Sequence, residues 1–452
     1  MLLLHDAICA LTTPPGVSGI AVVRLSGEGI FDIAAQCFRS KTPLADVPSH
    51  TIHYGTWRIG TEAVDTVTVA VFRAPASYTG DDTLEISCHG GYFVAQQILS
   101  SLCAGGARIA EPGEFTKRAF LNGKMDLTQV ESVAEIIHAA STSGSQIAAR
   151  QLTGSLKRSV EELRSRLIRT CSLLELELDF AHEDIEFTDR SEINTLLDDC
   201  LRFCHTVRQT YHATELIKNG FKIGLMGFPN AGKSTLFNML VGRERAITNP
   251  TPGTTRDYLE DAFEVNGFRV LLYDTAGIRE SDDAIEVAGI NLSRTVLAQC
   301  HAIIIVNDIS LSADHSDDLM RYATEHYPDS ERLLVQNKAD LIAGASAYSG
   351  SGILLSALRS EGREELLRRI TACVMNSMQP SQQFLINQRQ SSLFANVEDS
   401  IRRSQESIAN GMSGEFVTLD IRRAIDALGQ ISGERYDEEI LNSIFANFCI
   451  GK

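Results

Sequence analysis

The feature that most constrains this chain is the run Gly227-Phe-Pro-Asn-Ala-Gly-Lys-Ser234, which fits the pattern G-x-x-x-x-G-K-[ST]. The short apolar run before it, 221–226, predicts a buried strand, and the run after it, 235–240, predicts the start of a helix. This order is the context that a phosphate-binding loop requires, because glycines let backbone N–H groups turn onto phosphate oxygens and the helix N-terminus favours negative charge. The sequence therefore predicts a nucleoside-phosphate site in which Lys233 reaches the outer phosphates and Ser234 holds Mg²⁺.

Further motifs follow in a fixed order, and together they make a chance glycine-rich turn a poor alternative. Gly253-Thr-Thr-Arg-Asp257 is a candidate switch segment, in which a threonine hydroxyl completes the Mg²⁺ shell. Asp274-Thr-Ala-Gly277 follows the apolar run 270–273, and it supplies a carboxylate near Mg²⁺ and a glycine N–H for the γ-phosphate.

The last two motifs select the base. Asn337-Lys-Ala-Asp340 follows an apolar run, and its aspartate can accept hydrogen bonds from N1 and the 2-amino group of guanine, a donor pair that adenine lacks. Ser356-Ala-Leu358 also follows an apolar run and is expected to lie behind the base. Because the aspartate accepts from guanine and not from adenine, GTP is predicted over ATP. The predicted GTP-binding residues, all from these motifs, are Asn230, Ala231, Gly232, Lys233, Ser234, Thr235, Thr254, Thr255, Asp274, Thr275, Ala276, Gly277, Asn337, Lys338, Asp340, Ser356, Ala357 and Leu358.

Composition narrows the class of protein. The 452 residues suggest two to four domains, and 44% hydrophobic with 22% charged residues is typical of a packed globular chain. No apolar run is long enough to predict a membrane span, and the N-terminus does not resemble a signal peptide. The ten cysteines are scattered, which suits a reducing cytoplasm without a disulfide framework. The net charge of −17 argues against a long basic RNA-binding surface, so if RNA is the substrate, another protein is expected to supply much of the phosphate contact.

The domain organisation follows from the changing periodicity along the chain. Residues 1–121 alternate expected strands and helices and predict a small α/β domain. Helical spacing dominates 122–218, where Thr128-Gln-Val-Glu131 fits a capping box at a helix start. Residues 219–378 hold all five motifs, and 379–452 return to helical spacing, so the simplest interpretation is one all-helical domain interrupted by the nucleotide domain. The expected strands of the first domain are 19–26, 65–72 and 83–87.

With these motifs placed, the chain resembles the MnmE (TrmE) family of bacterial tRNA-modification GTPases, among the TrmE-Era-EngA-like GTPases, over nearly its whole length. Besides the GTPase motifs, the resemblance is carried by Pro14-Pro-Gly16, Arg24-Leu-Ser-Gly27, His89-Gly-Gly91, the run 112–124 and the C-terminal Cys449-Ile-Gly-Lys452. It implies an α/β fold class, with a Ras-like P-loop GTPase domain inserted into a helical domain and an N-terminal α/β domain similar to folate-binding domains. It also implies a homodimer that forms through the first domain.

The family resemblance further implies an activity. Proteins of this family act with a flavoprotein, MnmG (GidA), on the wobble uridine of certain tRNAs, and add an aminomethyl or carboxymethylaminomethyl group at C5. The one-carbon donor is a folate, either 5-formyl- or 5,10-methylene-tetrahydrofolate, whereas FAD and NADH belong to the partner. The folate-contacting residues carried over by motif are Arg24, Glu85, Lys124 and Lys452. Cations suit the glutamate tail of folate and a carboxylate suits its pteridine edge, although Arg24 and Glu85 paired only with each other remain an alternative.

Ras-like proteins place a glutamine directly after the Asp-x-x-Gly motif to orient the attacking water. In this chain Ile278 follows Asp274-Thr-Ala-Gly277, so another residue or a partner must take that role. The resemblance places the catalytic residue at Glu286, which would orient the attacking water. The alternative is a solvated residue on a surface helix. The family also binds K⁺ when two nucleotide domains meet, which replaces an arginine finger. The metal ligands implied are Ser234 and Thr255 for Mg²⁺, and Asn230, Asn249, Thr251 and Thr254 for K⁺.

A second function stays open at this stage, namely a regulatory or ribosome-assembly GTPase of the Era/Der type with no one-carbon chemistry. The nucleotide motifs alone do not separate the two. The N-terminal domain and the Cys449-Ile-Gly-Lys452 tail favour tRNA modification, since an assembly GTPase would carry a basic RNA-binding appendage.

Overall fold

The computed structural model describes residues 6–179, 190–242, 259–274, 294–311, 314–342, 350–378, 384–446 and 448–452. The chain forms two compact units. The first unit comprises Met1–Ala134, Gln151–Asp189 and Ser407–Lys452, and the second comprises Glu135–Arg150 and Arg190–Glu406. Within the described ranges, no helix has the length and apolar character needed to cross a membrane.

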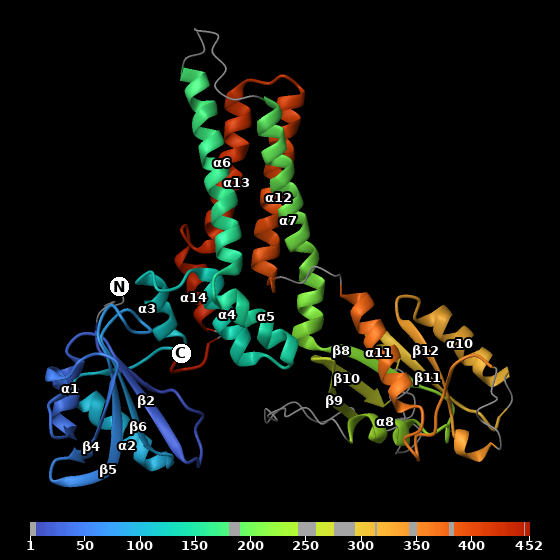
Figure 1. The fold of residues 1–452 in the computed structure, drawn as a ribbon, viewed down its shortest axis with the longest axis horizontal. Coiled ribbons are helices and arrows are strands. Elements are labelled where there is room, and N and C mark those ends of the chain that lie inside the picture. Colours follow the sequence, from blue (N-terminus) through green and yellow to red (C-terminus); the bar gives the residue numbers. More distant parts are fainter. Residues whose placement is uncertain are drawn as a thin grey trace. The chain divides into compact units, whose positions relative to one another are not determined.

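The first unit contains a seven-stranded sheet in the order β3-β4-β5-β6-β2-β1-β7 (Figure 1). Its elements are β1 (Ile8–Leu11), β2 (Ile20–Ser26), α1 (Ile30–Cys37), β3 (Phe38–Arg39), β4 (Thr51–Ile59), β5 (Glu62–Phe72), β6 (Thr83–His89), α2 (Tyr92–Ala104) and β7 (Arg108–Ile109). The pairs are antiparallel except β1 with β7, which is parallel. Alternate side chains, including Val23, Leu25 and Leu84, pack with α1 and α2 into a buried core on one side of the sheet.

Helices complete the first unit. They include α3 (Glu114–Leu121), α4 (Leu127–His138), α6 (Ser155–Asp179), α13 (Gly414–Ser432) and α14 (Glu438–Ala446). The helices α6 and α13 pack side by side (Figure 1). The sequence predicted the start of α4 closely, but the predicted capping residues are wrong. Asp126 is the capping side chain: its Oδ1 accepts from the N–H of Gln129 at 2.8 Å, while Oε1 of Gln129 accepts from the N–H of Asp126 at 3.1 Å.

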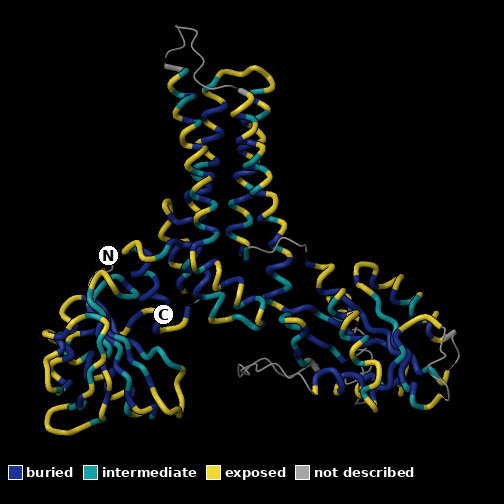
Figure 2. The backbone as a smooth tube through the Cα atoms, in the orientation of Figure 1, coloured by how far each residue is buried: buried dark blue, intermediate teal, exposed yellow. Residues whose placement is uncertain are grey.

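The second unit contains a six-stranded sheet in the order β13-β12-β11-β8-β10-β9, in which the pairs are parallel except β9 with β10. The strands are β8 (Phe221–Met226), β9 (Leu259–Val265), β10 (Phe268–Asp274), β11 (Ala302–Asp308), β12 (Glu331–Asn337) and β13 (Ile353–Leu354). The central strand β11 is buried along its whole length, as Figure 2 shows for the interior of this sheet. Parallel central strands covered on both faces are the usual reason for such continuous apolar runs.

Helices cover both faces of this sheet. Leu236 of α8 (Lys233–Val241) and Ile370 of α11 (Arg363–Ser377) share one core with Ile304, whereas Leu319 of α10 (Asp314–His326) shares another with Ile303. The remaining helices of the unit are α5 (Thr142–Leu152), α7 (Arg190–Asn219) and α12 (Gln388–Ala409). Along the chain the nucleotide motifs therefore lie between the long helices α7 and α12, as the sequence predicted. The numerical domain boundaries remain a prediction.

Candidate functional site

The glycine-rich loop joins β8 to α8 and has a backbone that few residues other than glycine tolerate. Asn230 and Gly232 have φ values of 63° and 94°. A Cβ at Gly232 would lie 2.3 Å from Nδ2 of Asn337, and one at Gly227 would lie 2.3 Å from the carbonyl oxygen of Val306. Close packing therefore requires glycine at both positions, and at Gly232 the left-handed backbone requires it as well.

Lys233 begins α8 and lies back across the loop. Its Nζ donates to the carbonyl oxygens of Gly227 and Phe228, both at 2.9 Å, and the residue is buried. This position holds an ammonium group at the N-terminus of α8, where the helix dipole and the loop N–H groups favour an anion.

Ser234 and Asp274 bring two oxygen ligands together. The parallel pairing of β8 with β10 puts Asp274 at the same sheet edge as the loop, and Oγ of Ser234 donates to Oδ2 of Asp274 at 2.9 Å. Asp274 is 3% exposed, so its carboxylate is held in place beside the hydroxyl. A hydroxyl oxygen and a carboxylate oxygen at this spacing fit the oxygen chemistry that Mg²⁺ requires.

Asn337, at the end of β12, ties three motifs together. Its Nδ2 donates to the carbonyl oxygen of Ala231 at 2.9 Å, and its Oδ1 accepts from the N–H of Ala357 at 3.0 Å. The side chain is 2% exposed, so both bonds are made inside the protein. The loop, the Asn337-Lys-Ala-Asp340 motif and the Ser356-Ala-Leu358 motif are thus held in one cluster.

Lys338 and Asp340, the two charged residues of the Asn337-Lys-Ala-Asp340 motif, also have hydrogen-bond partners. Oγ of Ser356 donates to Oδ1 of Asp340 at 2.6 Å, and this hydrogen bond lowers the pKa of the Asp340 carboxyl. Nζ of Lys338 donates to Oδ2 of Asp308 at 2.7 Å. Burial alone would raise the pKa of Asp308, but the hydrogen bonds from Lys338 and Ser310 outweigh it and the pKa is lowered. An ionised Asp340 is the form that accepts from the N1 and 2-amino groups of a guanine.

Other predicted residues are peripheral or lie outside the described part of the chain. Thr235 is exposed on α8, and Leu358 is 77% exposed. The residues outside the described ranges are Asn249, Thr251, Thr254, Thr255, Thr275, Ala276, Gly277 and Glu286. Their roles remain predictions.

A second cluster lies on the sheet of the first unit. Arg24 of β2 stands directly opposite Glu85 of β6, so the two side chains share one face of the sheet. Nε and Nη2 of Arg24 donate to Oε1 of Glu85 at 3.1 and 2.8 Å. The guanidinium carbon also lies 5.1 Å from the ring centre of Tyr78 and 5.4 Å from that of Phe115. Nη1 of Arg24 is buried and has no hydrogen-bond partner within the described chain.

The C-terminal tail reaches this cluster. Burial, followed by the positive charge of Arg24, lowers the pKa of Lys452, while the charges of Glu85 and Cys449 oppose the shift. Gly451 has φ of 100°, and a Cβ there would lie 2.5 Å from the carbonyl oxygen of Leu11 in β1. Lys452 therefore lies near enough to Arg24 and Glu85 for their charges to act on it, while the direct contact in the cluster is the Arg24–Glu85 pair.

Lys124 is not part of that cluster in the contacts that the described chain makes. Its Nζ donates to the carbonyl oxygen of Pro75 at 2.9 Å. Pro75 lies in the segment 73–82 between β5 and β6. The same segment carries Tyr78, which contacts Arg24, so Lys124 is connected to Arg24 through this segment.

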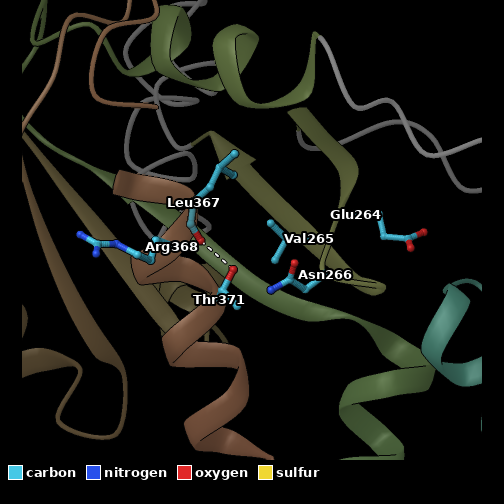
Figure 3. A pocket seen from close by; sticks show the side chains of 6 residues that line it. All are labelled: Glu264, Val265, Asn266, Leu367, Arg368 and Thr371. Carbon is cyan, nitrogen blue, oxygen red and sulfur yellow. Dashed lines mark hydrogen bonds between the residues drawn. The ribbon is translucent and has the colours of Figure 1, made fainter. Parts of the chain in front are cut away.

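An open pocket of about 400 Å³ lies in the second unit, and its lining residues belong to neither cluster (Figure 3). It lies between the β9–β10 hairpin and α11, and Oγ1 of Thr371 there donates to the carbonyl oxygen of Leu367 at 2.8 Å. Its lining residues are Glu264, Val265, Asn266, Leu367, Arg368 and Thr371, none of which was predicted to bind nucleotide or folate.

Comparison with known proteins decides the family. The profile described as "GTP-binding protein TrmE N-terminus" matches residues 7–124, and the profile described as "MnmE helical domain" matches residues 127–449. The chain belongs to the MnmE family of GTPases. A curated tRNA modification GTPase MnmE from Parabacteroides distasonis is 38% identical over 99% of this chain and 100% of its own length. The one from Salinibacter ruber is 39% identical over 99% of both chains.

The family assignment, together with the strand order of the second unit, confirms the expected fold class: an N-terminal α/β domain, a helical domain and a Ras-like GTPase domain. Among solved structures, the G domain of the T. maritima FeoB iron transporter matches with 25% identity over 35% of this chain and 99% of that chain. Its TM-score of 0.25 is too low to add an argument.

Sequence reasoning missed three residues that contact these clusters. Asp308 ends a parallel strand beside β8 and β12, and the rule that ligands bind at the carboxyl ends of parallel strands could have identified it. Tyr78 and Phe115 contact Arg24 from distant segments, and no local sequence signal marks those contacts.

Proposed function

We propose that this chain is a GTPase that acts with a flavoprotein partner of the MnmG (GidA) kind on C5 of the wobble uridine of certain tRNAs. The reaction adds an aminomethyl or carboxymethylaminomethyl group and takes its one-carbon unit from a folate. The observation that carries the proposal is the similarity, over 99% of the chain, to curated tRNA modification GTPases. All ten cysteines are free, which is consistent with a reducing cytoplasm as the place of action.

The geometry of the second unit supports GTP and Mg²⁺ as its ligands. Lys233 and the N-terminus of α8 suit the phosphates, and the ionised Asp340 suits the guanine edge. Ser234 and Asp274 supply oxygen atoms for Mg²⁺, which neutralises phosphate charge when bound. Thr255 would complete that shell.

For hydrolysis we propose the arrangement that the family resemblance implies. Two nucleotide domains meet, and K⁺ is held by Asn230 together with Asn249, Thr251 and Thr254. Glu286 then orients the attacking water. Asn230 has a left-handed backbone, which asparagine adopts more readily than most residues other than glycine, and its side-chain oxygen is the atom that we assign to K⁺.

The first unit supports the folate part of the proposal. Glu85 and Lys452 supply charges of opposite sign beside Arg24, and the buried Nη1 of Arg24 is a donor that no described protein group satisfies. A folate carries both a pteridine edge and a glutamate tail, so acceptors are available for such a donor. These three side chains, with Lys124 nearby, are the ones we assign to folate.

Homodimer formation through the first domain is supported by an open part of the same sheet face. Strand pairing places Ile52, Ala70, Glu85 and Arg24 in one row across the sheet. Ile52 is 72% exposed, and Tyr54 on the same strand and face is 71% exposed. Apolar side chains left exposed together on a sheet face are typical of an interaction surface.

The experiment that tests the function is mass spectrometry of tRNA nucleosides from cells that lack this gene. The C5-aminomethyl family of wobble uridines should disappear and return with the wild-type gene. If these nucleosides persist and no second gene copy exists, the proposal fails and an Era/Der-type regulatory or assembly GTPase becomes the leading alternative. The match of 7–124 to the TrmE N-terminal profile disfavours that alternative at present.

Glu286→Ala tests the hydrolysis step separately. We expect the variant to keep GTP binding and to hydrolyse GTP at least about tenfold more slowly, because the attacking water loses its orienting carboxylate. The variant should also fail to restore the modified nucleosides. Hydrolysis at the wild-type rate, measured by phosphate release in K⁺ buffer, would refute the assignment of Glu286.

A further inference from the structure

The guanidinium of Arg24 contacts two aromatic rings as well as its ion-pair partner Glu85. Its guanidinium carbon is 5.1 Å from the centre of the Tyr78 ring and 5.4 Å from that of Phe115. Both distances are within the range in which a cation is attracted to a ring face. Phe115 is fully buried in a core with Ile8 and Ala10, against which Tyr78 also packs. The guanidinium therefore contacts two rings in addition to Glu85, and both rings belong to the packed interior of the first unit.

Tyr78 is itself held from several directions. Its hydroxyl is 2.9 Å from Oγ1 of Thr116, at the start of α3. The next residue, Thr79, is fully buried, and its hydroxyl is 2.8 Å from Oγ of Ser26. Nδ2 of Asn122 donates to the carbonyl oxygen of Thr79 at 2.8 Å. The position of the Tyr78 ring is thus set by the strand β2 and the helix α3 rather than by the loop alone.

The hydrogen bonds of Arg24 show why the contacts with the two rings matter for the orientation of its guanidinium. Two of its nitrogens, Nε and Nη2, bond to one oxygen of Glu85, and the third, Nη1, is buried without a partner in the described chain. Leaving a buried donor unsatisfied costs free energy, so a side chain free to rotate would move Nη1 towards water. The two rings oppose that rotation.

We propose that Tyr78 is a positioning residue of the folate site: its ring, anchored on Thr116, holds the Arg24 guanidinium against Glu85 so that Nη1 stays available for an acceptor atom of the ligand. This role deepens the proposed function and rests on it, because the ligand is the folate assigned above. Tyr78 acts through Arg24, so its contribution disappears when Arg24 is replaced.

The test is calorimetric binding of 5-formyltetrahydrofolate to the full chain. Tyr78→Phe keeps the ring but loses the hydrogen bond to Thr116 and should bind about threefold more weakly than wild type, whereas Tyr78→Met removes the ring and should bind about tenfold more weakly. In the Arg24→Lys background, which lacks the two-nitrogen contact with Glu85, Tyr78→Met should change the affinity by less than about twofold. Tyr92→Leu, a half-exposed tyrosine on α2, is the matched control and should bind as wild type does.

The outcomes separate this inference from the proposed function. If wild type does not bind the folate, the folate part of the proposed function fails. If wild type binds and Arg24→Lys weakens binding, but Tyr78→Met binds as wild type does or weakens binding equally in both backgrounds, the positioning role alone is overturned. If Tyr78→Met does not fold, as judged by the fluorescence of the single tryptophan, Thr116→Val replaces it. Thr116→Val should weaken binding about threefold when residue 24 is arginine and should not weaken it in the Arg24→Lys background. If Thr116→Val changes the affinity equally in the two backgrounds, the proposal is overturned.

Discussion

The buried amide of Asn337 links three segments of the nucleotide site. It donates to Ala231 in the phosphate loop and accepts from Ala357 behind the expected base. The same Nδ2 is the atom that a Cβ at Gly232 would approach to 2.3 Å. The loop glycine and the asparagine therefore depend on each other, although they lie far apart in the sequence.

We expect Asn337→Ala to destabilise the second unit by about 2–4 kcal/mol, because it leaves a buried carbonyl and a buried N–H unsatisfied. GTP affinity should fall as well, since both groups belong to segments that surround the ligand. Urea unfolding followed by hydrogen exchange of β8 and β12 gives the stability, and binding of a fluorescent GTP analogue gives the affinity. Asn219→Ala, which removes an exposed bond to Glu215, is the control and should change neither measurement.

A partly buried charge network gives the first unit a pH dependence. Arg118, 2% exposed, donates to Asp6 at 2.6 Å and to Glu114 at 3.0 Å, and Arg108 also pairs with both carboxylates. Burial would raise the pKa of Glu114, but hydrogen bonds from Arg108, the Glu111 N–H and Arg118 outweigh it, so the pKa is lowered from 4.5. Burial would also raise the pKa of Asp6, but hydrogen bonds and charges from Arg108 and Arg118 outweigh it, so this pKa is lowered too.

Because the folded-state pKa of Glu114 is lowered, its contribution to stability is complete above pH 4.5 and is lost as the pH falls through the lowered value. We expect Glu114→Gln to cost about 3 kcal/mol at pH 7, and the difference from wild type to shrink steadily as the pH is lowered from 4.5 towards 2. Trp57, the single tryptophan of the chain, is buried in this unit and reports its unfolding by fluorescence. A difference that stays constant over this pH range would contradict the network's role.

At the scale of elements, the β9–β10 hairpin joins the nucleotide site to a helix of the same unit. In the sequence, β9 follows the candidate switch 253–257, and β10 ends at Asp274 of the next motif. The turn residues Asn266 and Gly267 have φ values of 49° and 83°, as a two-residue hairpin turn of this kind requires. The carbonyl oxygen of Gly267 accepts from the N–H of Ser143 at the start of α5, at 3.0 Å.

Gly267→Ala should cost about 1–2 kcal/mol from backbone strain, plus a further loss because its Cβ would lie 2.8 Å from Oγ of Ser143. Gly60→Ala is the matched control: Gly60 also turns a hairpin, with φ of 59°, but a Cβ there meets nothing within 4 Å. Hydrogen exchange of the first turn of α5 should therefore speed up in Gly267→Ala only. Equal costs and unchanged exchange in α5 would show that the turn does not dock on that helix.

Sequence reasoning predicted elements well where the signal was local. The strand expected at 221–226 is β8, and the strand expected at 19–26 is β2 within one residue. The capping box was misplaced by two positions because Asp126, an equally good capping residue, precedes the threonine that was chosen. Strand β4 was missed because its Thr-Ile-His-Tyr-Gly-Thr-Trp run mixes polar and apolar residues on a partly open sheet.

The candidate site was predictable only in part. Motif spacing identified Ser234 and Asp274, and the structure places them 2.9 Å apart. Pairing of Arg24 with Glu85 depends on strand register across 61 positions, and the contacts with Tyr78 and Phe115 depend on the packing of α3. Neither follows from periodicity, which constrains one segment at a time.

At the scale of the whole molecule, both ends of the chain build the first unit. Phe445 and Phe448 pack in one core with Phe120 and Leu127, and the N–H of Gly113 donates to the carbonyl oxygen of Cys449 at 3.4 Å. The whole of the second unit lies between these segments in the sequence. The first unit is therefore completed only when the last residues of the chain return to it, which makes its folding depend on long-range contacts.

Removal of 449–452 tests what the returning tail contributes. Lys452 is lost, so we expect the affinity for 5-formyltetrahydrofolate to fall at least about tenfold, because a cation beside Arg24 and Glu85 is removed from the folate site. GTP affinity should not change, since every described contact of the nucleotide cluster lies in the second unit. Lys452→Met keeps the docking of Gly451 against Leu11 and removes only the charge, so it separates the two contributions. If the truncated chain binds the folate as tightly as wild type, the tail only packs against the first unit and Lys452 is not part of the site. If GTP affinity falls as well, the two sites are coupled through the chain.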